Sequence, residues 1–542
     1  MKKLNDLGWL KQEFESMEVQ FNSLHDDMQI NLDGYKYNFF YAPRPGMSQP
    51  SRTGVNLAQL FLDKLWYHTS EFPKINVPSS PEDNQNAEMR EKIVLATHQK
   101  NGCEQLWGDW TFDGGAMGMA VAITLFDVKK RCVTIDRVDP RRVWYQKADS
   151  NNDQLEVLWT AVPMTKTAIQ RRYGVTPTGG EGMTYDMLSD GNGIPQDNED
   201  YYLVINRYDD ESHVRWVGHQ FLLKPYKHLQ GGIPADIAMP IKVANFDNLP
   251  SFYLDKLKDL QAEFNELWRR RANVVRKLGN PLVYGRGIYK QNEADVKEQL
   301  QGDGGFVSLK ENGELALLTI PETKMIDTAL SDCFQKMKDV AGFPTATFGE
   351  VVGANTSGDA LGMYFTPTQK MVNHYNKAYK AFLSGINTKI LRGYDMFAKI
   401  DEQFSLNGYM TNGSVRSGDN EKQTRKGQAY EVTFTKENIG HNYLTVVTPG
   451  AVTPKDDIQY KRFILDAVTN KFMSRQTGLD EIGVLSPEDE FKRLQTEQSD
   501  PMLNPEGASA VAQFDPGARL EQDNPLPAGV EGGIEEQLPV GV

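Results

Sequence analysis

Apolar residues recur at helical spacing along three stretches in the second half of the chain. In the first stretch they follow one another in steps of three, four or seven, which predicts a helix over about residues 252–278. Acidic side chains gather near its start and basic ones near its end, as a helix dipole favours, and Gly279-Asn280-Pro281 ends it. The apolar stripe consists of Leu254, Leu257, Leu260, Phe264, Leu267, Val274 and Leu278.

A second helix is predicted over about residues 322–341, and a third, much longer one follows a loop that contains Gly349, Gly353, Ser357 and Gly358. Pro367 lies near the start of the third helix and predicts a kink or break there. Between the first two helices, Asn312-Gly313 separates two strand patterns, at 306–310 and 314–320, which predicts a β-hairpin. The stripes are Ile326, Leu330, Phe334, Met337 and Ala341 in the second helix, and Met371, Tyr375, Ala378, Phe382, Ile386, Ile390, Tyr394 and Phe397 in the third.

The first half of the chain mixes helical and strand patterns, so the predicted fold class is α+β. Helical patterns cover residues 52–66, 87–109 and 164–173, and the near-apolar run 116–127 also looks helical. Strand patterns rich in β-branched and aromatic residues lie at 133–138, 143–146, 155–162, 201–208, 213–223 and 241–246, with later ones at 430–435 and 443–447. Helices return at 455–471 and after Ser486-Pro487.

The length of the chain indicates how many modules it can form, and its net charge bears on how it could interact with DNA. The chain has 542 residues, enough for several packed modules, and a net charge of −14. A tight DNA binder normally carries a basic excess, whereas a pore through which DNA slides does not need one. The last 44 residues hold six Pro, six Gly and eight acids, which predicts a disordered acidic tail.

The longest near-apolar run, residues 116–126, is well short of the ~20 residues that a membrane span needs. The first residues turn polar at once and offer no signal-peptide core. We therefore expect a soluble, non-secreted protein with no membrane partner. Cys103, Cys132 and Cys333 are far apart and lack metal-site spacing, so we expect buried or idle thiols and no metal site.

The motifs of common enzyme classes are missing from the sequence. No GxxxxGK[ST] phosphate loop, HExxH pair or GxSxG elbow occurs, and Gly302-Asp303-Gly304-Gly305 lacks the lysine of a phosphate cradle. His374 lies in the long helical pattern and is interpreted as a packing or interface residue and not as a metal ligand. We therefore expect a protein that is not an enzyme and needs no cofactor.

The basic run Arg269-Arg270-Arg271 is open to two interpretations. It could contact DNA phosphates. The more ordinary interpretation is a helix end that is solvated or paired with acids of a neighbouring helix, and the sequence favours this one.

The order of two helices joined by a small α/β segment, then a loop and a long helix, resembles the portal proteins of tailed bacteriophages. The resemblance covers about residues 40–497; its motifs are similar to the family's N-terminal wing, stem entry, tunnel-loop region and crown. The stretch 364–368, interrupted by Pro367, departs from the family's smooth helix opening. The motifs are Ile75-Asn76-Val77 with Gly114-Gly115-Ala116-Met117-Gly118; Ile241-Lys242-Val243-Ala244-Asn245-Phe246; Gly342-Phe343-Pro344 with Asn355-Thr356-Ser357-Gly358-Asp359-Ala360-Leu361; and Met473-Ser474-Arg475-Gln476-Thr477 with Ser486-Pro487-Glu488-Asp489-Glu490-Phe491-Lys492-Arg493-Leu494.

The resemblance implies a ring-shaped homo-oligomer, commonly a dodecamer, at one capsid vertex of a virion, assembled in the host cytoplasm. Its other partners would be double-stranded DNA passing through without sequence specificity, the terminase large subunit, the major capsid protein and scaffold, and head–tail adaptor proteins. The implied division is an N-terminal wing (1–250), stem helix 1 (251–278), a clip (279–321), stem helix 2 (322–342), a tunnel loop (343–357), a long kinked helix with returning wing strands (358–452), crown helices (453–498) and the acidic tail (499–542).

The resemblance also implies three groups of site residues. The tunnel loop facing DNA would include Thr345, Thr347, Phe348, Gly349, Glu350, Gly353, Asn355 and Thr356. The stem lining would include Arg269, Arg270, Lys324, Lys336 and Lys338, and the clip docking surface Arg286, Tyr289, Lys290, Lys310 and Asn312.

Three other functions stay open at this stage. The chain could be another virion structural or connector ring protein, although small connectors rarely reach this length. A DNA-processing enzyme with a divergent site would show ATP- or metal-dependent turnover. A cytoplasmic scaffold would assemble without an axial hole.

Overall fold

The computed structural model describes residues 3–37, 54–78, 83–149, 152–177, 201–228, 231–242, 249–279, 283–288, 309–317, 323–348, 358–399, 402–409, 429–450, 457–470 and 472–473. The chain forms two units, residues 1–463 and 464–542, and the first holds nearly all of the described elements. It is a mixed α+β unit whose strand pairs are all antiparallel in the described part of the chain. The predicted fold class is confirmed at this level.

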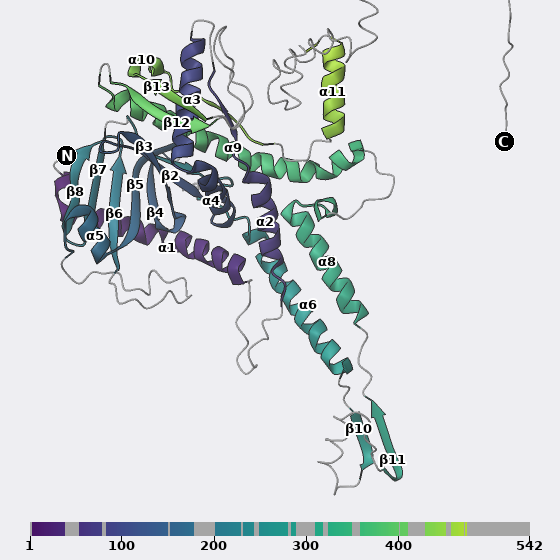
Figure 1. The fold of residues 1–542 in the computed structure, drawn as a ribbon. Coiled ribbons are helices and arrows are strands. Elements are labelled where there is room, and N and C mark those ends of the chain that lie inside the picture. Colours follow the sequence, from purple (N-terminus) through teal and green to yellow (C-terminus); the bar gives the residue numbers. More distant parts are fainter. Residues whose placement is uncertain are drawn as a thin grey trace, which may run out of the picture. The chain divides into compact units, whose positions relative to one another are not determined.

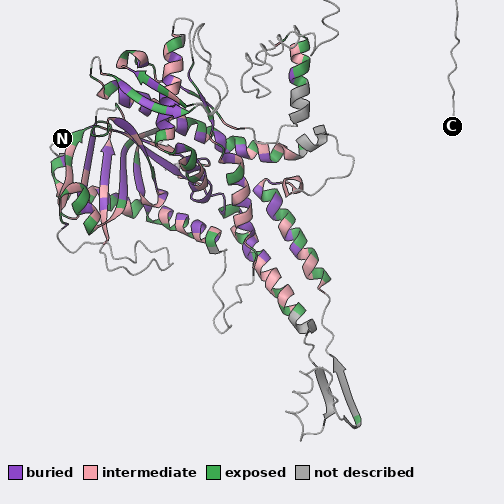
Figure 2. Cartoon of the chain, viewed as in Figure 1, coloured by how far each residue is buried: buried purple, intermediate pink, exposed green. Residues whose placement is uncertain are grey.

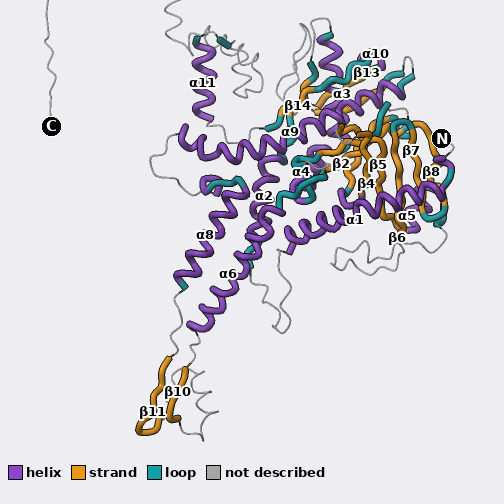
Figure 3. Tube along the Cα trace, turned by 180° about the vertical axis from the view of Figure 1, so that it is seen from behind, coloured by secondary structure: helices purple, strands orange, loops and turns teal. Residues whose placement is uncertain are grey.

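A five-stranded sheet and a helix on its face dominate the N-terminal half (Figures 1 and 3). The sheet has the order β4-β5-β6-β7-β8, and α1 (Leu7–Tyr37) packs Phe14 against Trp144 and Trp159 of the sheet. A second, smaller apolar cluster consists of Ile169 of α5, Val204 and Val217. The strands are β4 (Val143–Asp149), β5 (Asn152–Thr165), β6 (Tyr201–Asp209), β7 (Ser212–Val217) and β8 (Gln220–Lys227), with η1 (Lys3–Asn5), η2 (Pro140–Arg142) and α5 (Lys166–Tyr173) beside them.

The long helix α9 (Gly358–Phe397) is packed on a three-stranded sheet of order β3-β2-β9. Trp110 of α4 meets Phe382 of α9 edge to face, and Phe126 of β2 stacks on Phe397. Buried residues gather here, as Figure 2 shows. The surrounding elements are α2 (Leu57–Thr69), α3 (Asn84–Lys100), α4 (Cys103–Ala116), β2 (Ala120–Asp127), β3 (Cys132–Val138) and β9 (Ala235–Ala238).

Three two-stranded sheets, four further α-helices and one short 3₁₀ helix complete the described structure. The sheets are β1 (Lys74–Asn76) with β14 (Val446–Thr448), β10 (Val283–Ile288) with β11 (Leu309–Leu317), and β12 (Phe404–Tyr409) with β13 (Ala429–Phe434). The helices are α6 (Asp255–Gly279), α8 (Lys324–Ala341), α10 (Lys436–Ile439) and α11 (Asp457–Thr469), and η5 (Thr345–Phe348) follows α8. All three cysteines are free and buried, as the sequence indicated.

Several local predictions are wrong, each for a physical reason. The helix-like run 116–127 contains β2, a central strand buried between β3 and β9; an apolar run this short has no periodicity that separates a buried strand from a buried helix. The single strand at 213–223 is the hairpin β7–β8, which turns at Gly218 with φ +50°. The region 87–109 is helical, as predicted, and consists of two helices, α3 and α4, separated at Gly102 with φ +65°.

The Asn312-Gly313 hairpin prediction is also wrong. Both residues lie inside β11, which pairs with β10, and the register shifts between Arg286 and Ile288 so that β11 carries extra residues at this point. Asn and Gly suit an irregular strand as well as a tight turn, because both accept unusual backbone angles.

Pro367 does not break the long helix. Helix α9 continues through Pro367 to Phe397, so the predicted break is absent. The proline lies in the third turn of the helix and cannot donate a backbone hydrogen bond there, so the helix continues through it without that bond. Most of the predicted strand 241–246, the late helix after Ser486 and the acidic tail lie outside the described residues.

Candidate functional site

The candidate site is built on two antiparallel helices, α6 and α8 (Figure 1). Tyr253, just before α6, donates its hydroxyl hydrogen bond to the carbonyl oxygen of Ala341 at the end of α8, over 3.0 Å. Near the other end of the pair, the Arg271 Nε donates to the Asp327 Oδ1 over 2.5 Å. These two contacts establish that the helices run in opposite directions. The predicted helices over 252–278 and 322–341 are confirmed.

The apolar stripes meet at the contact between the two helices. Leu257 of α6 is fully buried, as is Met337 of α8, and Cys333 lies within 3.5 Å of the carbonyl oxygen of Leu260. Steps of three and four on each helix place these residues on one face, which is why the sequence pattern located them. Residues near the start of α6, such as Leu254 and Leu257, are buried, whereas Val275 farther along the helix is exposed (Figure 2).

The arginine run contacts acids of both helices. Arg269 and Arg270 both pair with Glu266 of their own helix, and Arg271 pairs with Asp327 of α8. The hydrogen bond from Arg271 lowers the pKa of the Asp327 carboxyl below its usual value. The structure therefore agrees with the interpretation that acids neutralise this run.

The three predicted lysines of α8 divide into two groups. Lys324 and Lys336 are exposed, so their ammonium groups can face a channel. Lys338 is 3% exposed, and its Nζ lies 4.5 Å from the ring centroid of Phe334 and 5.4 Å from that of Phe348. Its assignment to a channel lining is therefore wrong. At this position of the helix the side chain points into the protein, where its ammonium group makes cation–π contacts with the two aromatic rings.

The start of the predicted tunnel loop is a turn held against the helices. The amide of Thr347 donates to the carbonyl oxygen of Pro344 over 2.9 Å, and Thr345, Thr347 and Phe348 are all half-buried. Phe348 is not projected away from the protein as a DNA-facing residue would be. The remaining predicted loop residues, Gly349, Glu350, Gly353, Asn355 and Thr356, lie outside the described residues.

Phe348 contacts rings and cations from two helices. Its ring centroid lies 5.6 Å from that of Phe61 in α2 and 6.1 Å from that of Phe334 in α8, edge to face in both cases. Lys64 Nζ lies 5.6 Å from the same ring and donates to the carbonyl oxygen of Thr347 over 3.4 Å. We call this set, with Lys338, the Phe348 anchor. The sequence did not suggest Phe61 or Lys64, because only the tertiary structure brings α2 next to α8.

Gly342 joins the anchor to the long helix. It caps α8 with φ +76°, a left-handed conformation that glycine adopts without a Cβ penalty. Its carbonyl oxygen accepts a 3.0 Å hydrogen bond from the Thr368 hydroxyl of α9. The end of α8, the turn at Thr345–Phe348 and the first part of α9 are therefore held together on either side of the predicted loop.

Phe348→Ala is expected to lower the free energy of unfolding by about 2 kcal/mol, because a half-buried ring and two edge-to-face contacts are lost. Phe348→Leu should lose about half as much, since the volume stays and the cation–π contacts go. Urea unfolding of the purified protein measures both. Equal, negligible effects of the two changes would show that Phe348 is not anchored.

The β10–β11 sheet connects the other ends of α6 and α8 along the chain. Arg286 lies opposite Glu314 in the strand register, Lys310 lies in β11 and Asn312 is exposed. Tyr289 and Lys290 lie outside the described residues. Of the five residues predicted to form the docking surface, three therefore lie on the β10–β11 sheet.

Searches for other chemistry and for relatives found no match. In the described ranges, no group of three or more His, Cys, Asp or Glu side chains is placed to hold a metal ion. Within those same ranges, no helix combines the length and apolarity needed to cross a membrane. No family model and no curated protein sequence matches the chain.

Proposed function

We propose that this chain is one subunit of the portal of a tailed bacteriophage, a ring-shaped homo-oligomer through which genomic DNA is packaged and ejected. The observation that supports the proposal best is the order of elements around α6 and α8. An antiparallel helix pair carries a small sheet at one end, and its other end leads through the Phe348 anchor into a loop and the long helix α9. In a ring, the pair would form the stem, the β10–β11 sheet the clip and residues 349–357 the tunnel loop.

Exposed apolar residues on the pair support assembly with neighbours. Met325 is 84% exposed on α8, and Val275 of α6 and Val340 of α8 are also exposed. These side chains lie outside the contact between the two helices, so neighbouring subunits could bury them. Each helix, at ~1.5 Å per residue, is roughly 25–40 Å long, enough for the wall of a tube.

The channel would act by geometry and weak electrostatics. Lys324, Lys336 and Arg270 are exposed cations of the described stem that could face DNA, and Arg270 shares the carboxylate of Glu266 with Arg269. Few unpaired cations leave the phosphates weakly held, so the duplex can slide. The protein would not be an enzyme and would need no cofactor. The packaging energy would come from ATP hydrolysis by the terminase, which would dock on the clip.

Electron microscopy of the purified full-length chain tests the proposal. End-on views are expected to show rings with an axial hole and about twelve-fold symmetry, as the resemblance implies. If only monomers appear, the chain is co-expressed with its capsid and scaffold proteins, and rings are then sought at one vertex of the capsids. Closed particles without a hole in both preparations would reject the portal proposal.

Turnover assays separate this proposal from a DNA-processing enzyme. The same preparation is incubated with ATP, with Mg²⁺ or Mn²⁺, and with linear duplex DNA. We expect neither nucleotide hydrolysis nor strand cleavage above the level of a preparation of the Met337→Asp variant. Metal-dependent cleavage that copurifies with the native chain would favour the enzyme.

A further inference from the structure

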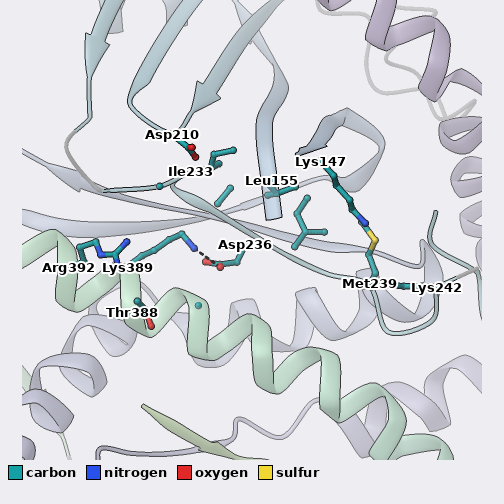
Figure 4. A pocket seen from close by; sticks show the side chains of 14 residues that line it. Lys147, Leu155, Asp210, Ile233, Asp236, Met239, Lys242, Thr388, Lys389 and Arg392 are labelled. Carbon is teal, nitrogen blue, oxygen red and sulfur yellow. Dashed lines mark hydrogen bonds and ion pairs between the residues drawn. The ribbon is translucent and has the colours of Figure 1, made fainter. Parts of the chain in front are cut away.

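A pocket of about 390 Å³ lies between α9 and β9, away from the helix pair (Figure 4). Lys389 and Arg392 of α9 reach it from one side, and Asp236 of β9 lies at its base. Lys147 and Lys242 reach it from the other side. The wall between them is apolar and includes Leu155, Ile233 and Met239.

The carboxylate of Asp236 is buried with only one of its oxygens bound. Asp236 Oδ1 accepts a 2.6 Å hydrogen bond from Lys389 Nζ, and both side chains are mostly buried, 13% and 18% exposed. Gly385 permits this approach, since a Cβ on it would lie 2.1 Å from Asp236 Oδ1. Asp236 Oδ2 is buried, and no donor in the described part of the chain reaches it. A buried acceptor without a donor is costly, so a donor from a ligand would be stabilising here.

The charges around Asp236 favour an anion. Four cationic side chains line the pocket, Lys147, Lys242, Lys389 and Arg392, against two acidic ones, Asp210 and Asp236. The Asp236–Lys389 pair is neutral as a unit, so the positive excess comes from the other walls. The pocket therefore combines cations for an oxyanion with one buried acceptor that requires a proton on the ligand.

We propose that this pocket binds a protonated phosphate, either inorganic phosphate or the terminal group of a phosphate monoester. The lysines would hold the charged oxygens, and the P–OH group would donate to Asp236 Oδ2. Sulfate has the same shape and carries no proton near neutral pH, so its oxygens would face a buried carboxylate oxygen. A phosphodiester of the DNA backbone has no P–OH group either, so the pocket would exclude it.

Burial supports the presence of a proton at this position. It raises the pKa of the Asp236 carboxyl above its usual value even though Lys389 opposes the shift. A proton shared between Asp236 and a phosphate oxygen is consistent with this environment. The inference is independent of the portal proposal, because none of these residues belongs to the helix pair or to the Phe348 anchor.

Isothermal titration of the full-length protein with inorganic phosphate tests the site, with sulfate as the matched anion at equal ionic strength. Saturable binding of phosphate is expected, at least about tenfold tighter than that of sulfate, the loss for one unmatched hydrogen bond to a charged group. A phosphate monoester should bind more tightly as the pH falls from about 8 to about 6, where it gains the proton of its P–OH group, whereas inorganic phosphate carries such a proton throughout this range. A third titration with ribose 5-phosphate distinguishes a monoester site from a site for free phosphate.

Two substitutions examine the roles of the paired residues. Asp236→Asn is expected to remove the preference for phosphate, because the amide can donate to a sulfate oxygen. Lys389→Met should weaken the binding of both anions by about tenfold or more. Asp332→Asn and Lys227→Met change exposed residues of the same types elsewhere and should leave binding unchanged.

Two results would overturn the proposal. The absence of saturable phosphate binding to the native chain rejects the site, and equal affinity for phosphate and sulfate rejects the role of Asp236. Both are measured on the unmodified protein, so they decide the question even if a variant fails to fold. Unchanged discrimination in a folded Asp236→Asn variant would also count against it.

Discussion

Met337→Asp is expected to lower the free energy of unfolding by about 4 kcal/mol or more, because a carboxylate would replace a fully buried thioether without any partner. Met337 lies on the face of α8 that packs on α6 and is 0% exposed. The variant should lose the contact between the two helices before the rest of the chain unfolds. Urea unfolding followed by circular dichroism measures the loss, and electron microscopy shows whether any ring still forms.

The same helix offers a matched control. Met325→Asp makes the same chemical change at a residue that is 84% exposed and in the first turn of α8, where a helix dipole tolerates an acid. Its effect on stability should stay within about 0.5 kcal/mol. If both changes were equally mild, the pairing of α6 with α8 would be wrong. A folded Met325→Asp variant that no longer forms rings would place this residue at a contact between subunits.

Arg137→Met is expected to destabilise the protein by about 2–3 kcal/mol at pH 8, because it leaves the buried carboxylate of Asp113 without its partner, although Arg137 itself is 34% exposed. Arg137 of β3 binds both carboxylate oxygens of Asp113 in α4, with both distances 2.6 Å, and the Asp113 side chain is 0% exposed. Without Arg137 the carboxylate is buried and unpaired. The exposed pair of Arg270 with Glu266 gives the control: Arg270→Met should cost less than about 1 kcal/mol.

The effect of Arg137→Met should depend on pH in a defined direction. Burial raises the pKa of Asp113 to about 7 even with Arg137 present. A carboxyl with a raised pKa in the folded state contributes stability that is complete below the ordinary value of 3.8 and is lost as the pH rises through about 7. Removing the cation raises the pKa further, so the variant should lose stability more steeply between about pH 5 and about pH 8.

A double substitution checks the cause. Asp113→Asn combined with Arg137→Met removes the charge that would be left buried, so it should recover much of the stability at pH 8 and flatten the dependence on pH. Thermal unfolding at pH 5 and pH 8 compares the variants. A single Arg137→Met variant that is no less stable at pH 8 than at pH 5 would show that Asp113 is not the source of the loss.

The helices of the candidate site could be predicted because their signal is local. The stripe that contains Leu257 and the stripe that contains Met337 each lie on one helical face, and these two residues are buried together with Phe264 and Leu330. Helix α1 carries a similar stripe through Phe14, Phe21 and Met28 and was not predicted, although the same test of spacing would have found it. The failures at residues 116–127 and at Asn312-Gly313 concern short segments, where one local pattern suits two structures.

The individual site residues were harder to predict than the elements that carry them. Lys338 looked like a channel cation because it is charged and lies on α8, yet its side chain is buried beside Phe334 and Phe348. Phe348 looked like part of an exposed loop, yet Phe61 and Lys64 of α2 hold it. Sequence spacing contains no information about which distant helix approaches a given face.

The sequence by itself determined the mixed helix and strand content, the apolar faces of helices α6 and α8, and the long helix α9, because periodicity and segment length are local properties. Only the tertiary structure decided which charges are paired, which lysine is buried and which oxygen of Asp236 lacks a donor. Those properties depend on residues far apart in the sequence, such as Asp236 and Lys389, whose contact exists only after β9 and α9 have packed together.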